Sequence, residues 1–334
     1  MLKAGVIGMG IGEKHALAYH NHCNVNLKTI CDFDDDKSQA LNIKFPNVSI
    51  ENKCQSILEN EDIDIVSIAS YDNFHVSQII KALKSGKHVM SEKPLCLNRR
   101  EMLQIYNIHQ QNPESKISSN LVLRTNSRFK MLKKDINEGK FGDVYYLEGD
   151  YLWGRKSKLF EWRADMEYYS IILGAAIHMI DLVMWLIDSR PLSVQAIGND
   201  IASKNTNLEF NSFAVVILKF ENGIIAKLTG NGGCVHPHFH DLKIFGTKQT
   251  AISNLNEAYF LQSSEMNSKQ VPIIEPYPEK EAREKIIHSF VDSILDPSIK
   301  PIVSQQDVYD VMSVCFAAEE AMNTGKSIII EYLD

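Results

Sequence analysis

The 334-residue chain has no pair of cysteines with C-x-x-C spacing. Its six cysteines are scattered, which argues against a disulfide framework or a zinc knuckle and favours reduced thiols in a cytoplasmic protein. The formal charge of −7 argues against the basic face that nucleic-acid binding needs. The N-terminal apolar run is too short for the core of a signal peptide. The longest apolar stretch, residues 171–187, contains His178 and Asp181, so we expect a buried helix and no membrane span.

Glycine and proline are also sparse, at 17 and 10 residues, while 44% of the chain is apolar and 23% is charged. These values are typical of globular proteins and exclude collagen-like, low-complexity and disordered classes. The length predicts about two domains.

Short apolar runs alternate with helical patterns over the first 120 residues. The runs cover residues 2–7, 25–31, 63–69, 87–90 and 117–123, and the helical patterns cover 13–21, 34–41, 75–85 and 99–109. This alternation predicts a parallel sheet covered by helices on both faces.

After residue 120 the pattern changes to strands without intervening helices. We expect strands at 143–152, 192–198, 211–220, 223–230 and 241–245, helices at 127–138, 171–187, 279–295 and 305–323, and a short terminal strand. Such a run of strands favours a mostly antiparallel sheet. The predicted division is a Rossmann domain at 1–120 and an α+β domain at 121–334.

A glycine-rich loop follows the first apolar run and opens a helix. Gly8, Gly10, Ile11 and Gly12 form it, and this context is typical of a loop that holds a dinucleotide pyrophosphate. Asp32 ends the second run, where a carboxylate binds the adenosine ribose and repels a 2′-phosphate. With no arginine near it, Asp32 favours NAD over NADP. Residues 34–36 are interpreted as acidic caps of a solvated helix.

The stretch Gly86-Lys87-His88-Val89-x-x-Glu92-Lys93-Pro94-Leu95 is the most specific in the chain. It resembles the signature of the Gfo/Idh/MocA oxidoreductases, and further matches follow in order from residue 4 to about 250. They include the loop at Gly8, the strand end at Asp32, Asn73 with His75, residues 139–142, 178–181 and 245–248. The resemblance implies a Rossmann domain followed by an open-faced, mostly antiparallel sheet that packs subunits into homodimers or homotetramers.

The resemblance also implies roles for individual residues. Lys93 contacts the reacting hydroxyl and helps to move its proton, while Glu92 shapes the loop beside the nicotinamide. Cofactor contacts are expected from Ser70, Asn73 and His75, the last two of which match the family pattern.

The helix at 171–187 departs from the family pattern. Many members carry Asp-x-Gly-x-His here, whereas this chain has Gly174 and Ala176 before His178. We expect His178 to take the substrate proton, because imidazole titrates near neutral pH. Gly174 is expected to leave room for a bulkier or anionic substrate, and Asp181 to be structural.

An aromatic and basic segment precedes this helix. Trp162, Arg163 and, earlier in the chain, Arg124 suit contacts with a sugar ring or an anionic group, although packing between domains explains each nearly as well. His236, His238 and His240 alternate in sequence, so we expect them on one strand face, contacting substrate or a neighbouring subunit. No metal site is expected from them.

The resemblance implies an NAD-dependent oxidoreductase that transfers a hydride to or from a hydroxyl-bearing carbon of a sugar, nucleotide-sugar or cyclitol. Two alternatives stay open. One is a redox-neutral enzyme that holds NAD tightly through glycoside cleavage or epimerisation, and the other is a non-catalytic, NAD-dependent sensor.

Overall fold

The computed structural model describes residues 1–334, apart from the side chains of residues 35, 36, 38 and 39. The expected capping role of residues 35 and 36 therefore lies outside the described side chains. The chain forms two compact units. Unit 1 comprises Met1–Leu121 and Glu281–Val308, and unit 2 comprises Val122–Lys280 and Tyr309–Asp334. Residues 281–308, which the sequence division places in the second domain, thus belong to unit 1.

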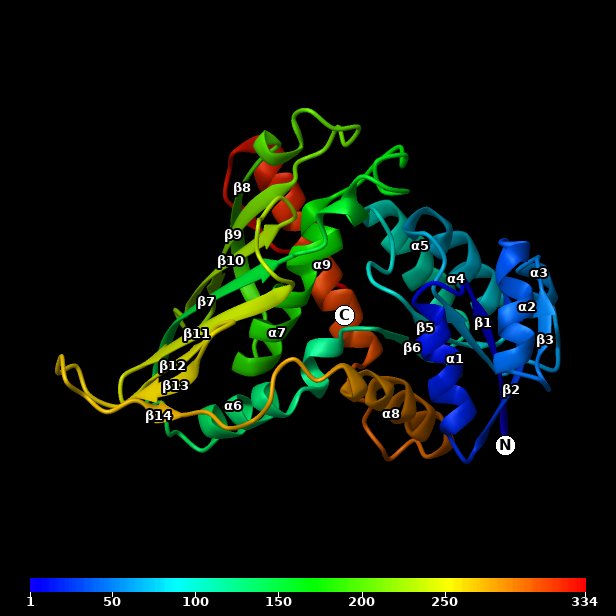
Figure 1. Cartoon of the computed structure of the whole chain (residues 1–334), viewed down its shortest axis with the longest axis horizontal. Helices are drawn as coiled ribbons and strands as arrows, with labels where there is room; N and C mark the ends of the chain where they lie inside the picture. The colour runs from blue at the N-terminus through cyan, green and yellow to red at the C-terminus, as the bar shows by residue number, and fades with distance from the viewer. The chain divides into compact units, whose positions relative to one another are not determined.

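Unit 1 contains a six-stranded sheet in the order β3-β2-β1-β4-β5-β6, with all neighbours parallel (Figure 1). The strands are β1 (Leu2–Ile7), β2 (Val25–Cys31), β3 (Ser49–Glu51), β4 (Ile65–Ile68), β5 (His88–Ser91) and β6 (Ile117–Ser119). The helices are α1 (Gly12–Asn21), α2 (Asp35–Lys44), α3 (Gln55–Leu58), α4 (His75–Lys84), α5 (Arg99–Gln110) and α8 (Glu284–Leu295). This strand order is that of dinucleotide-binding folds, and it confirms the predicted Rossmann architecture.

Helix α8 joins unit 1 because it packs against α1. Its His288 side chain contacts the carbonyl oxygen of Ala18 at 2.9 Å, and Asp292 lies 3.2 Å from His22. Ile286, Ile287 and Phe290 on the same helix are buried. Helix α8 therefore buries its apolar face within the Rossmann unit, although more than 150 residues of sequence separate it from the rest of that unit.

Unit 2 contains a nine-stranded sheet in the order β14-β13-β12-β11-β7-β10-β9-β8-β15. Only β7 and β10 pair in parallel, so the prediction of a mostly antiparallel sheet is confirmed. The strands are β7 (Val144–Leu152), β8 (Pro191–Asn199), β9 (Phe213–Phe220), β10 (Ile225–Asn231), β11 (Phe239–Gly246), β12 (Thr250–Ser253), β13 (Ala258–Leu261), β14 (Val271–Pro272) and β15 (Ile328–Ile329). The helices of this part of the chain are α6 (Ser127–Asn137), α7 (Ile177–Ile187) and α9 (Gln305–Thr324).

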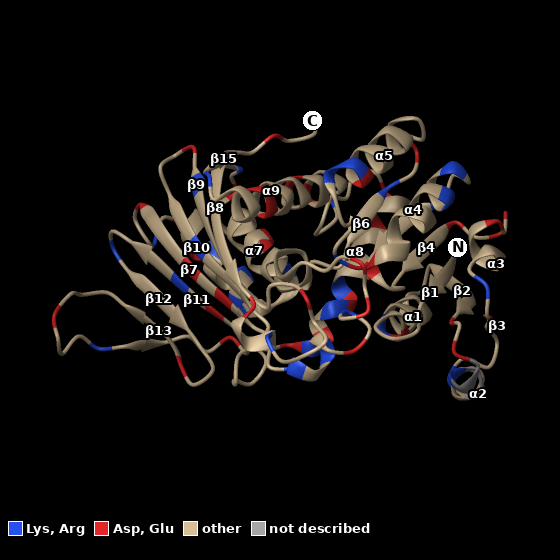
Figure 2. Cartoon of the chain, turned by 90° about the horizontal axis from the view of Figure 1, so that it is seen from above, with Lys and Arg blue, Asp and Glu red and all other residues tan. Residues whose placement is uncertain are grey.

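The two faces of the nine-stranded sheet differ in what covers them. Helix α7 lies on one face, where a Cβ on Gly149 would stand 2.7 Å from the Met179 side chain. On the other face Glu148 accepts hydrogen bonds from Lys227 and from Lys243 on the flanking strands. Figure 2 shows charges of both signs along these strands. Successive side chains along these strands thus point in turn to a face buried under helices and to a face of paired charges and apolar side chains.

The structure differs from the sequence prediction in several elements. The 171–187 helix begins as a π-helical turn, Ile172–Ala176, before α7. The run at 117–123 forms only three strand residues and then a 3-10 turn, Val122–Thr125. The short elements β3, α3, β12, β13 and β14 were not predicted, because two to four residues carry too little periodicity to be recognised.

No helix among the described residues combines the length and the apolar character needed to span a membrane.

Candidate active site

The glycine-rich loop lies between β1 and α1, beside the end of β4. Gly8 has a φ of +86°, and a Cβ there would stand 2.4 Å from the carbonyl oxygen of Ala69, so only glycine is accommodated. A Cβ on Gly10 would meet nothing within 4 Å, which leaves the outer side of the loop open. Ile11 precedes α1, and no described side chain caps it. The first amide groups of α1 can therefore bind a phosphate.

Asp32 is buried at the end of β2, and its carboxylate is held in place by backbone groups. Oδ2 accepts a hydrogen bond from the amide of Met9 at 2.6 Å, and Oδ1 accepts one from the amide of Asp34 at 3.0 Å. The exposed ammonium of Lys37 lies 3.6 Å from Oδ1. No arginine is near in sequence, but this lysine brings a cation to Asp32 from the following helix. The carboxylate is thus fixed beside the glycine-rich loop, where it can accept ribose hydroxyls.

The loop after β4 contains three residues for which cofactor contacts were expected. Ser70 donates a hydrogen bond from its hydroxyl to Gln78 at 2.8 Å, and Asn73 is exposed. His75 is fully buried: its ring nitrogens lie 2.7 Å from the carbonyl oxygen of Pro94 and 3.1 Å from that of Ser70. Both ring nitrogens of His75 thus contact the backbone, contrary to the expected contact with the cofactor. His75 instead connects the loop after β4 to the loop after β5 and positions both.

Glu92 anchors the lysine loop that follows β5. Its Oε1 lies 3.1 Å from His15 Nε2 and accepts a hydrogen bond from the amide of Asn120, while Oε2 accepts one from the Lys93 amide at 3.3 Å. Burial alone would raise the pKa of Glu92. Three neighbours outweigh this effect and lower the pKa of Glu92 to about 2. His15 contributes a hydrogen bond and its charge, the Asn120 side chain contributes a hydrogen bond, and Lys93 contributes its charge. Glu92 is therefore ionised and positions the Lys93 backbone.

His15 extends this network into the core. Its Nδ1 lies 3.1 Å from the hydroxyl of Ser67, which in turn contacts the Tyr19 hydroxyl at 2.9 Å. These contacts link Glu92 through His15 and Ser67 to Tyr19.

In unit 2, aromatic and imidazole rings gather around Tyr151 on β7. We call these residues the Tyr151 ring cluster: Tyr151, Trp153, His178, His238 and His240. The His178 ring stacks on Tyr151 with centroids 5.6 Å apart and planes 6° apart. His238, His240 and Trp153 meet Tyr151 edge to face, with centroids 5.3, 4.7 and 5.7 Å away. The cluster combines proton-transfer groups with flat apolar surfaces, which suits a polyhydroxylated ring.

Tyr277 contacts one member of the cluster, His240, but is not itself part of it. Its hydroxyl hydrogen-bonds His240 Nδ1, and its ring lies under the guanidinium of Arg128. Tyr151 and Tyr277 were not predicted, because no local sequence pattern distinguishes them from core aromatic residues.

The three alternating histidines do not share one strand face. Strand β11 begins only at Phe239, so His236 and His238 precede it. His238 contacts the Trp153 carbonyl oxygen at 2.6 Å and lies beside His240, whereas His236 folds back on the Pro237 carbonyl oxygen at 2.7 Å. Within the described part of the chain no cluster of three or more histidine, cysteine or acidic side chains could hold a metal.

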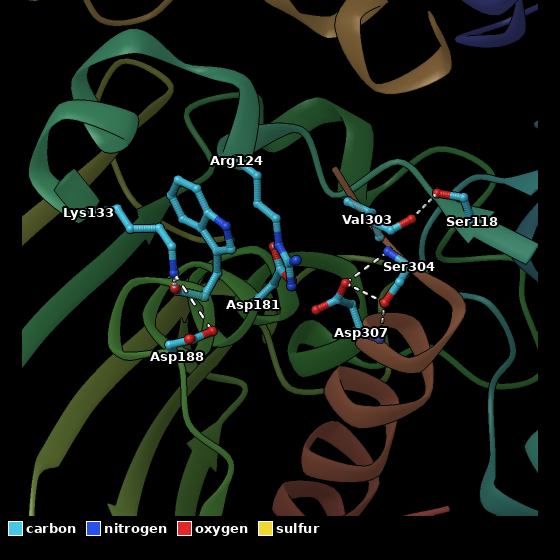
Figure 3. Close-up of polar contacts among 9 residues, drawn as sticks. Ser118, Arg124, Lys133, Asp181, Asp188, Val303, Ser304 and Asp307 are labelled. Carbon is cyan, nitrogen blue, oxygen red and sulfur yellow. Dashed lines mark hydrogen bonds and ion pairs between the residues drawn. The ribbon is translucent and has the colours of Figure 1, made fainter. Parts of the chain in front are cut away.

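Arg124, expected to bind an anionic substrate group, is instead paired within the core. Its Nη2 lies 2.6 Å from Asp181 Oδ1, and its Nε is 3.1 Å from both carboxylate oxygens. Both side chains are buried and point toward one another (Figure 3). A buried carboxylate needs a cation, and Arg124 provides it for Asp181. The prediction that Arg124 binds an anionic substrate group is therefore withdrawn.

Trp162 and Arg163 lie together in the segment before the π-helical turn. The Arg163 guanidinium lies 4.1 Å from the Trp162 ring centroid and 5.3 Å from that of Trp153. Both side chains are only partly buried. Arg163 thus places a cation next to the Tyr151 ring cluster.

Family profiles match both units. The profile described as an oxidoreductase family with an NAD-binding Rossmann fold matches residues 2–116, and that of the GFO/IDH/MocA C-terminal domain matches residues 129–252. The chain belongs to the Gfo/Idh/MocA oxidoreductase family.

Individual relatives of this Gfo/Idh/MocA chain are distant. Myo-inositol 2-dehydrogenase from Thermotoga maritima is 22% identical over 99% of both chains. The crystal structure of myo-inositol 2-dehydrogenase from Lactobacillus plantarum has a TM-score of 0.84 at 22% identity, covering 99% of both chains. A structure of levoglucosan dehydrogenase in complex with NADH also has a TM-score of 0.84, at 20% identity, covering 99% of this chain and 100% of that one. These likenesses establish the shared fold.

The cofactor of this Gfo/Idh/MocA protein is NAD, and the geometry of unit 1 agrees with it. A Cβ on Gly10 would meet nothing within 4 Å, so the loop leaves space beside the first amides of α1, and the Asp32 carboxylate is fixed next to it.

Proposed function

We propose that this protein is an NAD-dependent dehydrogenase of a sugar, nucleotide-sugar or cyclitol. The observation that carries the proposal is the arrangement at the carboxyl ends of β1, β4 and β5. There the glycine-rich loop follows β1, and the loop that bears Lys93 follows β5, held by Glu92 and His75. Ligands bind at this edge of doubly wound sheets, where the strand order reverses. The named relatives act on inositols and on levoglucosan, which supports a polyhydroxylated ring as the substrate class.

NAD, when bound, accepts or returns a hydride at its nicotinamide. The chain's own residues would bind and orient the reactants. In the proposal the Lys93 ammonium of unit 1 donates a hydrogen bond to the reacting hydroxyl. For unit 2, His178 Nδ1 or Nε2 is the proposed acceptor of a substrate proton. Tyr151 keeps the His178 ring in one plane through their stacking contact. Trp162 and Arg163 are proposed to contact the substrate beside the Tyr151 ring cluster of unit 2.

A screen of sugars, cyclitols and nucleotide-sugars for NADH fluorescence tests this function. We expect stoichiometric NADH from at least one class. Lys93→Ala should lower kcat by about 10²–10⁴-fold, the usual contribution of a general acid–base group, while NADH affinity is retained. Near wild-type turnover in Lys93→Ala would remove Lys93 from the mechanism.

The same screen distinguishes the alternatives. A redox-neutral enzyme would change the substrate without net NADH. Glycoside cleavage through a transient ketone would also exchange the hydrogen on the carbon next to that ketone for solvent deuterium, whereas epimerisation at the oxidised carbon would not. A sensor would bind NADH but alter none of the compounds.

We also propose that the protein forms a homodimer or homotetramer through the uncovered face of the nine-stranded sheet. Ile197, Ile217 and Ile225 on β8, β9 and β10 are 76%, 40% and 44% exposed there. Exposed isoleucines on neighbouring strands favour burial against a second copy. Light scattering after chromatography tests this: Ile217→Glu should give monomers, whereas Lys326→Glu, outside the sheet, should not. The cytoplasmic location expected from the sequence stays a prediction.

A further inference from the structure

Two aromatic rings meet at the carboxyl edge of the parallel sheet of unit 1. Phe33 directly follows Asp32 after β2, and Tyr71 directly follows Ser70 after β4. The two ring centroids lie 5.9 Å apart, with the planes inclined by 61°. Because β1 lies between β2 and β4 in the sheet, this contact spans the strand that leads into the glycine-rich loop. The rings therefore lie at the edge of the sheet where ligands bind.

The Phe33 ring is largely open to solvent. Phe33 is 70% exposed, whereas Asp32 directly before it is 5% exposed. Single apolar side chains are common on protein surfaces, but here two aromatic rings from different loops contact one another beside a buried carboxylate. Such a pair forms a flat apolar surface, and covering that surface with another flat ring is favourable.

The position of Asp32 indicates which ring can cover Phe33. The Asp32 carboxylate is held by the amides of Met9 and Asp34 and can accept the hydroxyls of the adenosine ribose of NAD. Adenine is bonded directly to that ribose, and consecutive residues of a chain are about 3.8 Å apart. The flat face of a base stacks on aromatic side chains. The exposed ring of Phe33 is therefore within reach of the adenine.

The spacing of the two rings determines how a base can stack on them. A base held between two rings needs centroids about 7 Å apart, since each stacking contact takes about 3.5 Å, and it needs parallel planes. The observed 5.9 Å and 61° provide neither. The base can thus cover the open face of Phe33, while Tyr71 meets the Phe33 ring edge to face and restricts where that ring can lie.

We propose that Phe33 is the residue on which the adenine ring of NAD stacks, and that Tyr71 is a positioning residue that holds the Phe33 ring. The base is then recognised by its flat face rather than by hydrogen bonds to its edge. Stacking of this kind tolerates different bases, because every base has a π-face. The inference concerns the cofactor site of unit 1 and does not depend on which substrate is oxidised.

Binding of three ligands, measured without any substrate, tests the role of Phe33. They are NADH, ADP-ribose, which keeps the adenosine half, and reduced nicotinamide mononucleotide, which lacks it. Phe33→Ala should weaken NADH and ADP-ribose by the same factor, about 5- to 150-fold, the effect of removing one stack between a base and an aromatic ring. Binding of the mononucleotide and the midpoint of thermal unfolding should be unchanged, because Phe33 is exposed.

Further variants separate the two roles. Phe33→Trp keeps an aromatic surface and should retain the affinity for NADH. Tyr71→Ala should weaken NADH and ADP-ribose by a few-fold, and Tyr71→Phe, which keeps the ring, should restore both. Leu103→Ala is the matched control, because Leu103 is an exposed apolar residue on α5, outside the loops after β2 and β4, and its removal should change none of these affinities.

The hypoxanthine analogue of NADH tests how the base is recognised. It lacks the adenine amino group but keeps the flat face, so the wild type should bind it within a few-fold of NADH. A loss of more than about 10-fold would overturn recognition by the face, since it would show that the edge of the base is read. Equal affinities of the wild type and Phe33→Ala for ADP-ribose would overturn the stacking role. If these affinities change as expected but no sugar or cyclitol reduces NAD, the proposed function fails and this inference stands.

Discussion

The imidazole of His178 and the phenol ring of Tyr151 stack with nearly parallel planes, their centroids 5.6 Å apart and their planes 6° apart. His240 meets both rings edge to face, with centroids 4.7 Å from Tyr151 and 6.3 Å from His178. The stack leaves His178 with one preferred ring plane, because rotation about its side-chain bonds would break contact with Tyr151. In its proposed role as proton acceptor, a His178 ring held this way would lose little entropy when the substrate binds.

Replacing Tyr151 should therefore affect turnover more than binding. Tyr151→Leu removes the flat surface under His178, and we expect kcat to fall about 10-fold or more because reacting groups are displaced. Tyr151→Phe preserves the stack and should retain most of the activity. Steady-state kinetics of both variants measure the difference. Equal losses in the two would assign the effect to the Tyr151 hydroxyl instead of the stack.

Glu92 should make the stability of unit 1 depend on pH. Its pKa is lowered from 4.5 to about 2 in the folded protein. A depressed carboxyl pKa adds stability that is complete above the unfolded pKa and is lost as pH falls through the folded pKa. The shift corresponds to about 3 kcal/mol at pH 7 and about 1 kcal/mol at pH 3.

Denaturant unfolding of wild type and Glu92→Gln at both pH values checks this. The stability difference between the two proteins should shrink by about 2 kcal/mol from pH 7 to pH 3. A difference that does not change with pH would show that the Glu92 contacts do not depend on its charge.

Asp32 and Lys37 should set the cofactor preference in opposite directions. Asp32→Ala removes the ribose acceptor and the repulsion of a 2′-phosphate, so the preference for NADH over NADPH should narrow about 10-fold or more. Lys37 lies 3.6 Å from Asp32 and partly offsets that repulsion. Lys37→Ala should widen the preference by a few-fold, because exposed charge pairs are weak.

Fluorescence titration with both reduced cofactors measures these preferences. Lys44→Ala provides the matched control, since Lys44 pairs with Glu13 rather than with Asp32. A tighter affinity for NADPH than for NADH in the wild type would contradict the assignment of Asp32.

The buried pair of Arg124 and Asp181 should be structural. Arg124→Ala leaves Asp181 buried without this cation, and we expect a loss of about 3–5 kcal/mol in the free energy of unfolding. Replacing both, as Arg124→Met with Asp181→Leu, should recover most of that loss because no charge remains buried. Thermal unfolding of the single and double variants checks this. If the double variant stays stable but no longer turns over the substrate of the wild type, Arg124 would return as a substrate-binding residue.

The sequence by itself determined the features that depend on local order. The glycine-rich loop, Asp32 at a strand end and the lysine loop at 92–95 each occupy a few consecutive residues after a predicted strand. Their backbone conformation follows from glycine, proline and strand periodicity, and the structure has the loop and the strand ends where these patterns put them. The two kinds of sheet were likewise predictable from whether helices separate the strands.

Only the tertiary structure decided where distant side chains meet. Arg124 pairs with Asp181, which lies 57 residues later in the chain. Helix α8 packs against α1, although more than 250 residues separate them in sequence. His75 is buried between two loops, and Tyr169 fills the space beside Gly174. Sequence patterns record which residues are apolar, charged or small, but not which partner a buried charge takes or which ring fills a gap. Those outcomes depend on close packing and on the cost of an unpaired buried charge, and both arise only when the whole chain is folded.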